Sequence, residues 1–244
     1  MKKIILFALV AVTAFAIQPV HAQTALDQQN LMQLGDRTGT STGRLIYTRA
    51  GSYYGVMGTP YLNDKWTMAT ITSLDGKKHE NTPVMYNAHY DLMEAVVGKD
   101  TLILNSRLIT SVEMPVTDAN GVRYITLKNG FSSASEKIES TNFFEILYEG
   151  SDFTLMRKHY KFLKPSDFNA AYNTGSKFDE FQMQTSTFVK TPDGEIQKVR
   201  TNRRDILRLM GDKSKQVEDF IKKEKLKYDD DAHLGRIFAY YESI

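Results

Sequence analysis

Between residues 66 and 200 the chain is a succession of short apolar runs separated by tight turns. The runs are rich in β-branched and aromatic residues, which are typical of strands. Asp75-Gly76, Asn120-Gly121 and Asp193-Gly194 lie between such runs, and each dipeptide can supply the positive φ angles of a two-residue hairpin turn. Connections this short leave no room for crossover helices. We therefore expect an antiparallel sheet.

Ten strands are predicted along this region. Their expected bounds are Trp66 to Ser73, Pro83 to Ala88, Asp91 to Val97, Thr101 to Leu104, Leu108 to Met114, Val122 to Lys128, Phe143 to Tyr148, Phe153 to Leu163, Phe178 to Val189 and Glu195 to Thr201. In the run Phe153 to Leu163, alternate residues form two faces. The faces differ little in polarity at the start of the run and more strongly towards its end. This pattern predicts a strand that leaves a two-sided core and ends at a solvated edge.

From Asn202 onward the apolar period changes from two residues to about 3.6, which predicts three short amphipathic helices. Their candidate N-caps are Asn202, then Asp212 or Ser214, then Asp230 or Asp231. Gly211 is a candidate stop for the first helix. The apolar stripes are narrow, so we expect the helices to pack on the sheet as one unit.

The predicted fold class is therefore α+β and mainly β. We expect an antiparallel meander that curls into a barrel-like or sandwich sheet, with short C-terminal helices packed on it. The β domain covers residues 64–201, and residues 202–244 form a helical cap of the same domain. Residues 23–63 have few long apolar runs, which indicates an irregular leader with one short strand over Arg44 to Arg49 and a turn-rich segment from Gly55 to Asn63.

Residues 1–22 have the pattern of a secretory signal peptide. Lys2 and Lys3 precede an apolar run from Ile4 to Ile17, and small residues occupy the −3 and −1 positions of a cleavage site after Ala22. The run is shorter than the roughly 20 apolar residues that a spanning helix needs. We expect a periplasmic or secreted protein that is not an integral membrane protein after cleavage.

The composition excludes several classes of function. The chain has no cysteine, which excludes a thiol nucleophile, a thiolate metal site and disulfides. Its 31 basic and 29 acidic residues produce no strong field, so we expect no nucleic-acid partner. The glycine spacing fits neither a phosphate-binding loop nor a dinucleotide fingerprint, and we predict no cofactor.

A motif at the start of the β region resembles one in a family of exported Gram-negative bacterial proteins of unknown function. It reads Gly58-Thr59-Pro60-Tyr61-Leu62-Asn63-Asp64-Lys65-Trp66 and is followed by a strand and the Asp75-Gly76 turn. The C-terminal pattern is similar too, with Asp212-Lys213, Leu226 and Tyr240-Tyr241. The resemblance implies an exported β-rich domain from about Gly58 to the end. It implies no catalytic residue, because the family has no assigned activity.

Three ligand-type side chains lie close together near residue 90. In a regular strand His89 and Asp91 project to one face and Glu94 to the other, so the three could not easily share a metal ion. We therefore predict no metal site. The plainer interpretation is a hairpin connection with solvated polar groups, and His89 is a candidate ligand-binding residue.

Three further residues are candidates for ligand binding. His159 lies in phase with Arg157 and Lys161, and a histidine among cations can bind a carboxylate or a phosphate. The plainer alternative for His159 is a solvated strand face. Trp66 and Tyr61, with Tyr53 and Tyr54, form an aromatic group that could stack on sugars or peptides. Core packing at the start of the sheet is the alternative for this group.

The sequence favours a non-enzymatic binding or scaffolding domain of the cell envelope, with a protein or a glycan as its partner. Sheet edges and exposed aromatic residues suit partner recognition. The first alternative is a periplasmic hydrolase that uses carboxylates, with Asp91, Glu94 and Asp152 as candidates. The second alternative is an outer-membrane β-barrel, against which the charged helical C-terminus argues.

Overall fold

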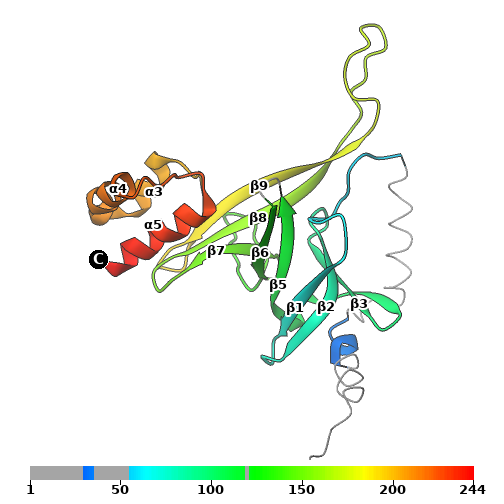
Figure 1. Ribbon diagram of the computed structural model, residues 1–244, viewed down its shortest axis with the longest axis horizontal. Helices are drawn as coiled ribbons and strands as arrows, with labels where there is room; N and C mark the ends of the chain where they lie inside the picture. The colour runs from blue at the N-terminus through cyan, green and yellow to red at the C-terminus, as the bar shows by residue number, and fades with distance from the viewer. Residues whose placement is uncertain (1–29, 36–54, 119–120) are drawn as a thin grey trace, which may run out of the picture.

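The computed structural model describes residues 30–35, 55–118 and 121–244 (Figure 1). The predicted signal peptide, the predicted strand over residues 44–49, and Tyr53 and Tyr54 lie outside these ranges. Within them, one ten-stranded sheet has the order β10-β9-β8-β7-β6-β5-β1-β2-β3-β4. Every neighbouring pair of strands is antiparallel, which confirms the predicted meander of strands.

The ten strands lie close to their predicted positions. Their bounds are β1 Thr67–Ser73, β2 Lys78–Asn87, β3 Leu92–Val97, β4 Asp100–Ile103, β5 Ile109–Asp118, β6 Gly121–Lys128, β7 Phe144–Glu149, β8 Thr154–Lys164, β9 Glu180–Lys190 and β10 Ile196–Val199. Gly76 and Gly194, with φ of 80° and 86°, provide the left-handed turn conformation that their Asp-Gly pairs predict.

The sheet is open rather than closed. Its end strands β10 and β4 each have four residues. The residues that follow β4 form backbone hydrogen bonds outside the sheet. There the backbone N–H of Asn105 donates to the carbonyl oxygen of Leu34 at 2.7 Å. Strands this short offer few hydrogen bonds with which to join the two ends of the sheet. The sheet is therefore not closed into a barrel.

A narrow seam divides the sheet into two halves. β6 and β7 pair through two residue pairs, Leu127 with Glu145 and Lys128 with Phe144. By contrast, β8 and β9 pair along eleven residues each. The half from β6 to β4 and the half from β7 to β10 must therefore be held together largely by contacts outside the ladder.

Three C-terminal helices lie beside the half formed by β7 to β10 (Figure 1). They are α3 Arg203–Leu209, α4 Ser214–Lys223 and α5 Asp231–Ser243. Asn202 and Asp230 cap α3 and α5, because their side chains accept from the backbone N–H groups of Asp205 and His233, both at 2.9 Å. Both N-caps are as predicted, whereas α4 begins without a side-chain cap.

The apolar core follows the division of the sheet. One cluster fills the half formed by β1 to β6, with Ile71, Tyr86, Met93, Met114 and Leu127 fully buried. A second cluster lies between the other half and the helices, and its members include Phe153, Leu155, Ile206, Val217, Leu234 and Phe238. Each half thus has its own hydrophobic support.

Residues 57–63, which we call the strap, connect both halves of the sheet. Met57 donates to the carbonyl oxygen of Asp179 at 2.8 Å and accepts from the N–H of Phe181 at 2.9 Å. At its other end, the N–H of Leu62 donates to the carbonyl oxygen of Tyr86 at 2.9 Å. The strap contains most of the Gly58–Trp66 motif, so this motif has a structural role, and the last residues of the predicted leader are bonded to the β domain.

Two glycines provide a test of the strap. Gly58 has a φ of 75°, and a Cβ added there would lie 3.2 Å from the carbonyl oxygen of Phe181, whereas Gly55, at φ 81°, has open space around it. Gly55→Ala should cost on the order of 1–2 kcal/mol of unfolding free energy through backbone strain. Gly58→Ala should cost about 1–3 kcal/mol more through overpacking. Urea denaturation of both variants measures the difference, and equal losses would contradict the close packing of the strap.

Candidate functional site

Asp91 is the centre of a polar cluster on the seam between the two halves of the sheet. It lies in the β2–β3 turn with a φ of 58°. Its Oδ1 accepts from the Tyr86 hydroxyl at 2.6 Å and from the Phe143 backbone N–H at 3.3 Å. Its Oδ2 accepts from Asn142 Nδ2 at 2.8 Å and from Lys158 Nζ. The carboxylate thus joins the β2–β3 turn to β8 and to the residues just before β7.

Tyr86, Phe143 and Lys158 of this cluster are buried. The Lys158 side chain is 8% exposed, donates to the carbonyl oxygen of Phe143 at 3.0 Å and lies over the ring of Phe144. Burial lowers the pKa of the Lys158 ammonium, and Asp91 opposes this effect. Burial and the Asp91 carboxylate together raise the pKa of Tyr86 well above its ordinary value. A buried ammonium of this kind depends on its carboxylate for compensation.

The three carboxylates considered for hydrolysis belong to different hydrogen-bond networks. Asp91 already accepts four hydrogen bonds, about the full capacity of a carboxylate. Glu94, buried on β3, accepts from the Tyr61 hydroxyl at 3.1 and 3.2 Å. Asp152 lies in the β7–β8 turn, where its backbone N–H donates to Glu242 at 3.0 Å. The four hydrogen bonds that Asp91 accepts therefore indicate a structural role for this carboxylate.

His89 attaches the β2–β3 turn to β8. Its Nδ1 lies 2.7 Å from the carbonyl oxygen of Lys161. The backbone N–H of Lys161 in turn donates to the carbonyl oxygen of Ala88 at 3.2 Å. Its ring packs edge-on against Phe181 and Tyr90. The left-handed Asp91 makes residues 88–91 a turn, which confirms the predicted hairpin connection, but Asp91 is bonded to protein groups rather than solvated as predicted. The described residues contain no group of three or more side chains suited to a metal ion.

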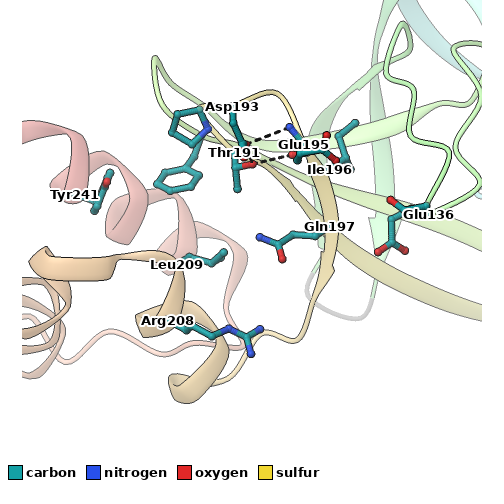
Figure 2. Close-up of a pocket in the computed structure, with 12 residues that line it drawn as sticks. Glu136, Thr191, Asp193, Glu195, Ile196, Gln197, Arg208, Leu209 and Tyr241 are labelled. Atoms are coloured by element: carbon teal, nitrogen blue, oxygen red, sulfur yellow. Dashed lines mark hydrogen bonds between the residues drawn. The ribbon is translucent and has the colours of Figure 1, made fainter.

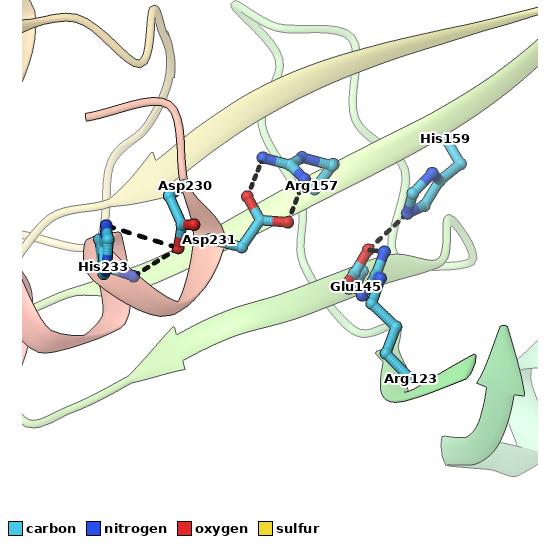
Figure 3. Close-up of polar contacts among 7 residues, drawn as sticks. All are labelled: Arg123, Glu145, Arg157, His159, Asp230, Asp231 and His233. Atoms are coloured by element: carbon cyan, nitrogen blue, oxygen red, sulfur yellow. Dashed lines mark hydrogen bonds and ion pairs between the residues drawn. The ribbon is translucent and has the colours of Figure 1, made fainter. Parts of the chain in front are cut away.

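His159 is buried in an ion-pair network on the other face of β8 (Figure 3). Its Nε2 lies 2.6 Å from Glu145 Oε2, and Arg123 on β6 donates to both oxygens of the same carboxylate. The prediction of a solvated strand face for His159 is therefore wrong. His159 does face a carboxylate, but this carboxylate is Glu145 of the same chain, which neighbouring β7 supplies.

The Glu145 network also crosses the seam, since Arg123 and Glu145 belong to different halves of the sheet. Burial alone would raise the pKa of the Glu145 carboxyl. Hydrogen bonds from His159 and Arg123, together with their positive charges, instead hold this pKa at about 2. Glu145 is thus ionised at neutral pH and contributes to the stability of the folded state.

A neighbouring ion pair attaches the helices to the sheet (Figure 3). Arg157 on β8 donates from both terminal nitrogens to the two oxygens of Asp231, at 2.5 Å. Asp231 is the first residue of α5, and such bidentate pairs fix orientation as well as distance. The run Asp229-Asp230-Asp231 thus provides one helix cap and one docking contact.

Tyr61 and Trp66 lie in different surroundings. Tyr61 is half-buried in the strap with its hydroxyl on Glu94, so it is part of the packed structure. Trp66 precedes β1 and is 41% exposed, which limits its contribution to the core. Two of the four predicted binding residues, His89 and His159, hold strands in place, and Tyr61 has a similar role.

The hairpin of β8 and β9 extends well beyond the rest of the sheet (Figure 1). We call residues 160–184 the arm and residues 165–179 its tip. The arm exposes large apolar side chains on its stem and at its tip: Tyr160, Phe162, Tyr172, Phe178 and Met183. The alternating pattern of β8 predicts the change from core to solvent, but no local signal in the sequence indicates that the hairpin projects.

The tip is ordered by local polar contacts. The N–H of Ser176 donates to Asp167 Oδ1 at 2.6 Å, and Asn169 and Thr174 exchange two backbone hydrogen bonds. A Cβ at Gly175 would lie 2.4 Å from the carbonyl oxygen of Asp167, so this tight crossing requires glycine. None of the residues 165–179 is buried. The tip therefore keeps its shape without a hydrophobic core.

A cavity of about 700 Å³ separates the edge strand β10 from helices α3 and α5 (Figure 2). Phe153, Leu209 and Tyr241 provide apolar surface, and Gln197 and Arg208 line the same cavity. At the edge itself, the N–H of Lys198 donates to Glu136 Oε1 at 3.1 Å. A side chain thus occupies the place of a neighbouring strand, which protects the edge from pairing.

Comparisons of the chain with family models, curated proteins and solved structures find no match. Every helix in the described part of the chain is too short or too polar to cross a membrane.

The Asp91–Lys158 pair can be tested by a double-mutant cycle. Asp91→Asn and Lys158→Met should each lower the unfolding free energy by about 3–5 kcal/mol, because each leaves a buried charge uncompensated. The double variant should lose less than the two losses combined, with a coupling of about 1–3 kcal/mol. The exposed pair Lys164–Asp167 is the control and should couple by less than about 1 kcal/mol. Equal coupling in the two pairs would contradict the role of Asp91.

Glu145 should control part of the acid denaturation. Its pKa of about 2 in the folded state lies below the ordinary value of 4.5, so its stabilisation is present above pH 4.5 and is lost as the pH falls towards 2. This stabilisation corresponds to about 3 kcal/mol. Glu145→Gln should remove that acid-dependent loss, whereas Glu149→Gln, on the same strand but exposed, should keep it. Urea denaturation from pH 7 to pH 2 measures both, and unchanged acid loss in Glu145→Gln would contradict this assignment.

Proposed function

We propose that this protein is a non-enzymatic binding domain of the cell envelope whose arm recognises another protein. The observation that carries the proposal is a projecting tip that has its own hydrogen bonds although none of its residues is buried. Ordering a segment costs roughly 1–2 kcal/mol per residue in backbone entropy, which core burial normally offsets. A projecting segment that is ordered without such burial is typical of recognition loops on a rigid scaffold. The location rests on the signal-peptide pattern of residues 1–22.

The chemistry of the tip favours a protein as the partner. Its residues include Tyr172, Asn173, Thr174, Gly175 and Ser176, a composition similar to that of antibody binding loops. Tyr172 is 77% exposed and offers a large amphipathic contact surface with little side-chain entropy to lose. Asn, Ser and Thr side chains can adapt their hydrogen bonds to a polar protein surface.

The stem of the arm extends this surface. Tyr160 and Phe162 lie on one face of β8, opposite Gln184 and Gln182 of β9, and Met183 lies on the other face. Because the hydrogen bonds of the tip already fix its shape, less entropy is lost on binding than for a mobile loop. The arm can therefore provide aromatic anchors from the stem to the tip.

Site-specific photo-crosslinking in the native envelope tests the proposal. A photoreactive phenylalanine analogue at position 172 should give a discrete protein adduct. The control is position 124, because Tyr124 on β6 is 82% exposed but lies outside the arm. Equal labelling from both positions, or no protein adduct from position 172, would refute recognition of a protein through the tip.

The adduct formed from stem position 162 should depend on the Tyr172 ring. Tyr172→Ala should reduce this adduct about tenfold or more, as expected for the loss of an aromatic anchor. Tyr124→Ala should leave it unchanged, and neither variant should alter the melting temperature by more than a few degrees, since both rings are exposed. Loss of the adduct in both variants would contradict a specific role for the tip.

A further inference from the structure

A second cavity, of about 440 Å³, lies beside Asp91, and we call it the Asp91 pocket. Three segments meet there: the β2–β3 turn, the short helix η1 (Ser106–Leu108), and the residues just before β7. Tyr90, Asn105, Arg107, Glu139 and Asn142 line it together with Asp91. Its volume lies within the range of small-molecule sites.

Two charged side chains in this pocket are available to a ligand. The Arg107 guanidinium and the Glu139 carboxylate make no hydrogen bond or ion pair with any residue that the structure describes. Their hydrogen bonds come from the backbone: the N–H of Arg107 donates to Asn105 Oδ1 at 3.0 Å, the N–H of Glu139 donates to Asn142 Oδ1 at 2.8 Å, and the carbonyl oxygen of Glu139 accepts from the backbone N–H of Asn142 at 2.9 Å. Side chains of opposite charge that line one pocket can act as donor and acceptor for one polar molecule.

The charges around the pocket favour an uncharged ligand. Lys158 compensates Asp91 directly, and Arg107 and Glu139 bring one positive and one negative charge to the lining of the pocket. An anion would be attracted by Arg107 but repelled by Glu139, and a cation would meet the reverse arrangement. A neutral molecule with both donors and acceptors can use both groups without such a penalty.

The amides in the wall are fixed before a ligand arrives. Asn142 donates one N–H to Asp91, accepts at Oδ1 from Glu139, and retains its second N–H. Asn105 accepts from Arg107 at Oδ1 and retains its amide hydrogens. Pre-organised polar groups lose little entropy on binding.

The ring of Tyr90 supplies the apolar part of the site. It is 44% exposed, lines the pocket, and is supported edge-on by His89 at 4.5 Å between ring centroids. Planar guanidinium, carboxylate and amide groups match the adjacent hydroxyls of a sugar, and an aromatic ring matches its C–H face. We propose that the Asp91 pocket binds a neutral saccharide, with Arg107 and Glu139 on its hydroxyls and Tyr90 against its apolar face.

Titration of the mature chain with sugars tests the site. The neutral probes are glucose, galactose, mannose, N-acetylglucosamine and their disaccharides, and the charged probes are glucuronate and glucosamine. NMR or calorimetry should show saturable binding of at least one neutral sugar, with a dissociation constant on the order of 1 mM, as expected for a small ligand. Both charged probes should bind about tenfold more weakly or worse.

Matched variants localise the binding. Arg107→Ala and Glu139→Ala should each weaken it about tenfold through loss of a charged hydrogen bond. Arg204→Ala on α3 and Glu113→Ala on β5, also exposed, should leave it unchanged. Tyr172→Ala should leave it unchanged too, which separates this site from the arm.

Three results would overturn the proposal. They are the absence of saturable binding by any neutral probe, binding of a charged probe as tight as that of the neutral ones, and binding that is unaffected by both pocket variants. Because the four charge variants alter exposed side chains, their melting temperatures should stay close to that of the parent, and a large drop would be visible in the same samples.

Discussion

The buried ion pair between Asp91 and Lys158 is the interaction on which the arrangement of the two sheet halves depends. The ladder that joins these halves consists of two residue pairs between β6 and β7. Asp91 belongs to one half and Lys158 to the other, and both are shielded from water. Because a buried charge without a partner is strongly unfavourable, separating the halves would expose or isolate both groups. The strap and the Arg123–Glu145 pair act in the same direction.

In this molecule the polar groups that hold the fold together differ from those that a ligand or a partner could contact. Glu145 and His159 hold neighbouring strands together, and Arg157 fixes α5 on the sheet through Asp231. Such groups have few hydrogen-bonding positions left for a ligand. Two surfaces that keep such positions are the arm, which needs the long β8–β9 ladder as its support, and the Asp91 pocket, whose wall is held by the same carboxylate that fixes the seam.

Much of the fold could be predicted from the sequence, because strand and turn signals are local. The ten apolar runs, the Asp-Gly turns and the change to a helical period at Asn202 each report on a few neighbouring residues. The candidate site was harder to predict. The sequence predicts a solvated face for His159 because Arg157 and Lys161 share that face of the strand, yet the partner that buries it, Glu145, comes from the adjacent strand.

The sequence by itself determined the kind of elements, their order and their antiparallel pairing, since periodicity and turn chemistry act over short distances. Only the tertiary structure decided that the sheet stays open and that its longest hairpin projects. Tertiary structure also brings Asp91 to Lys158, 67 residues further along the chain. The reason is that side-chain partners depend on strand register and sheet curvature. Bulges such as the one between Ile146 and Tyr148 change both without altering the hydrophobic pattern.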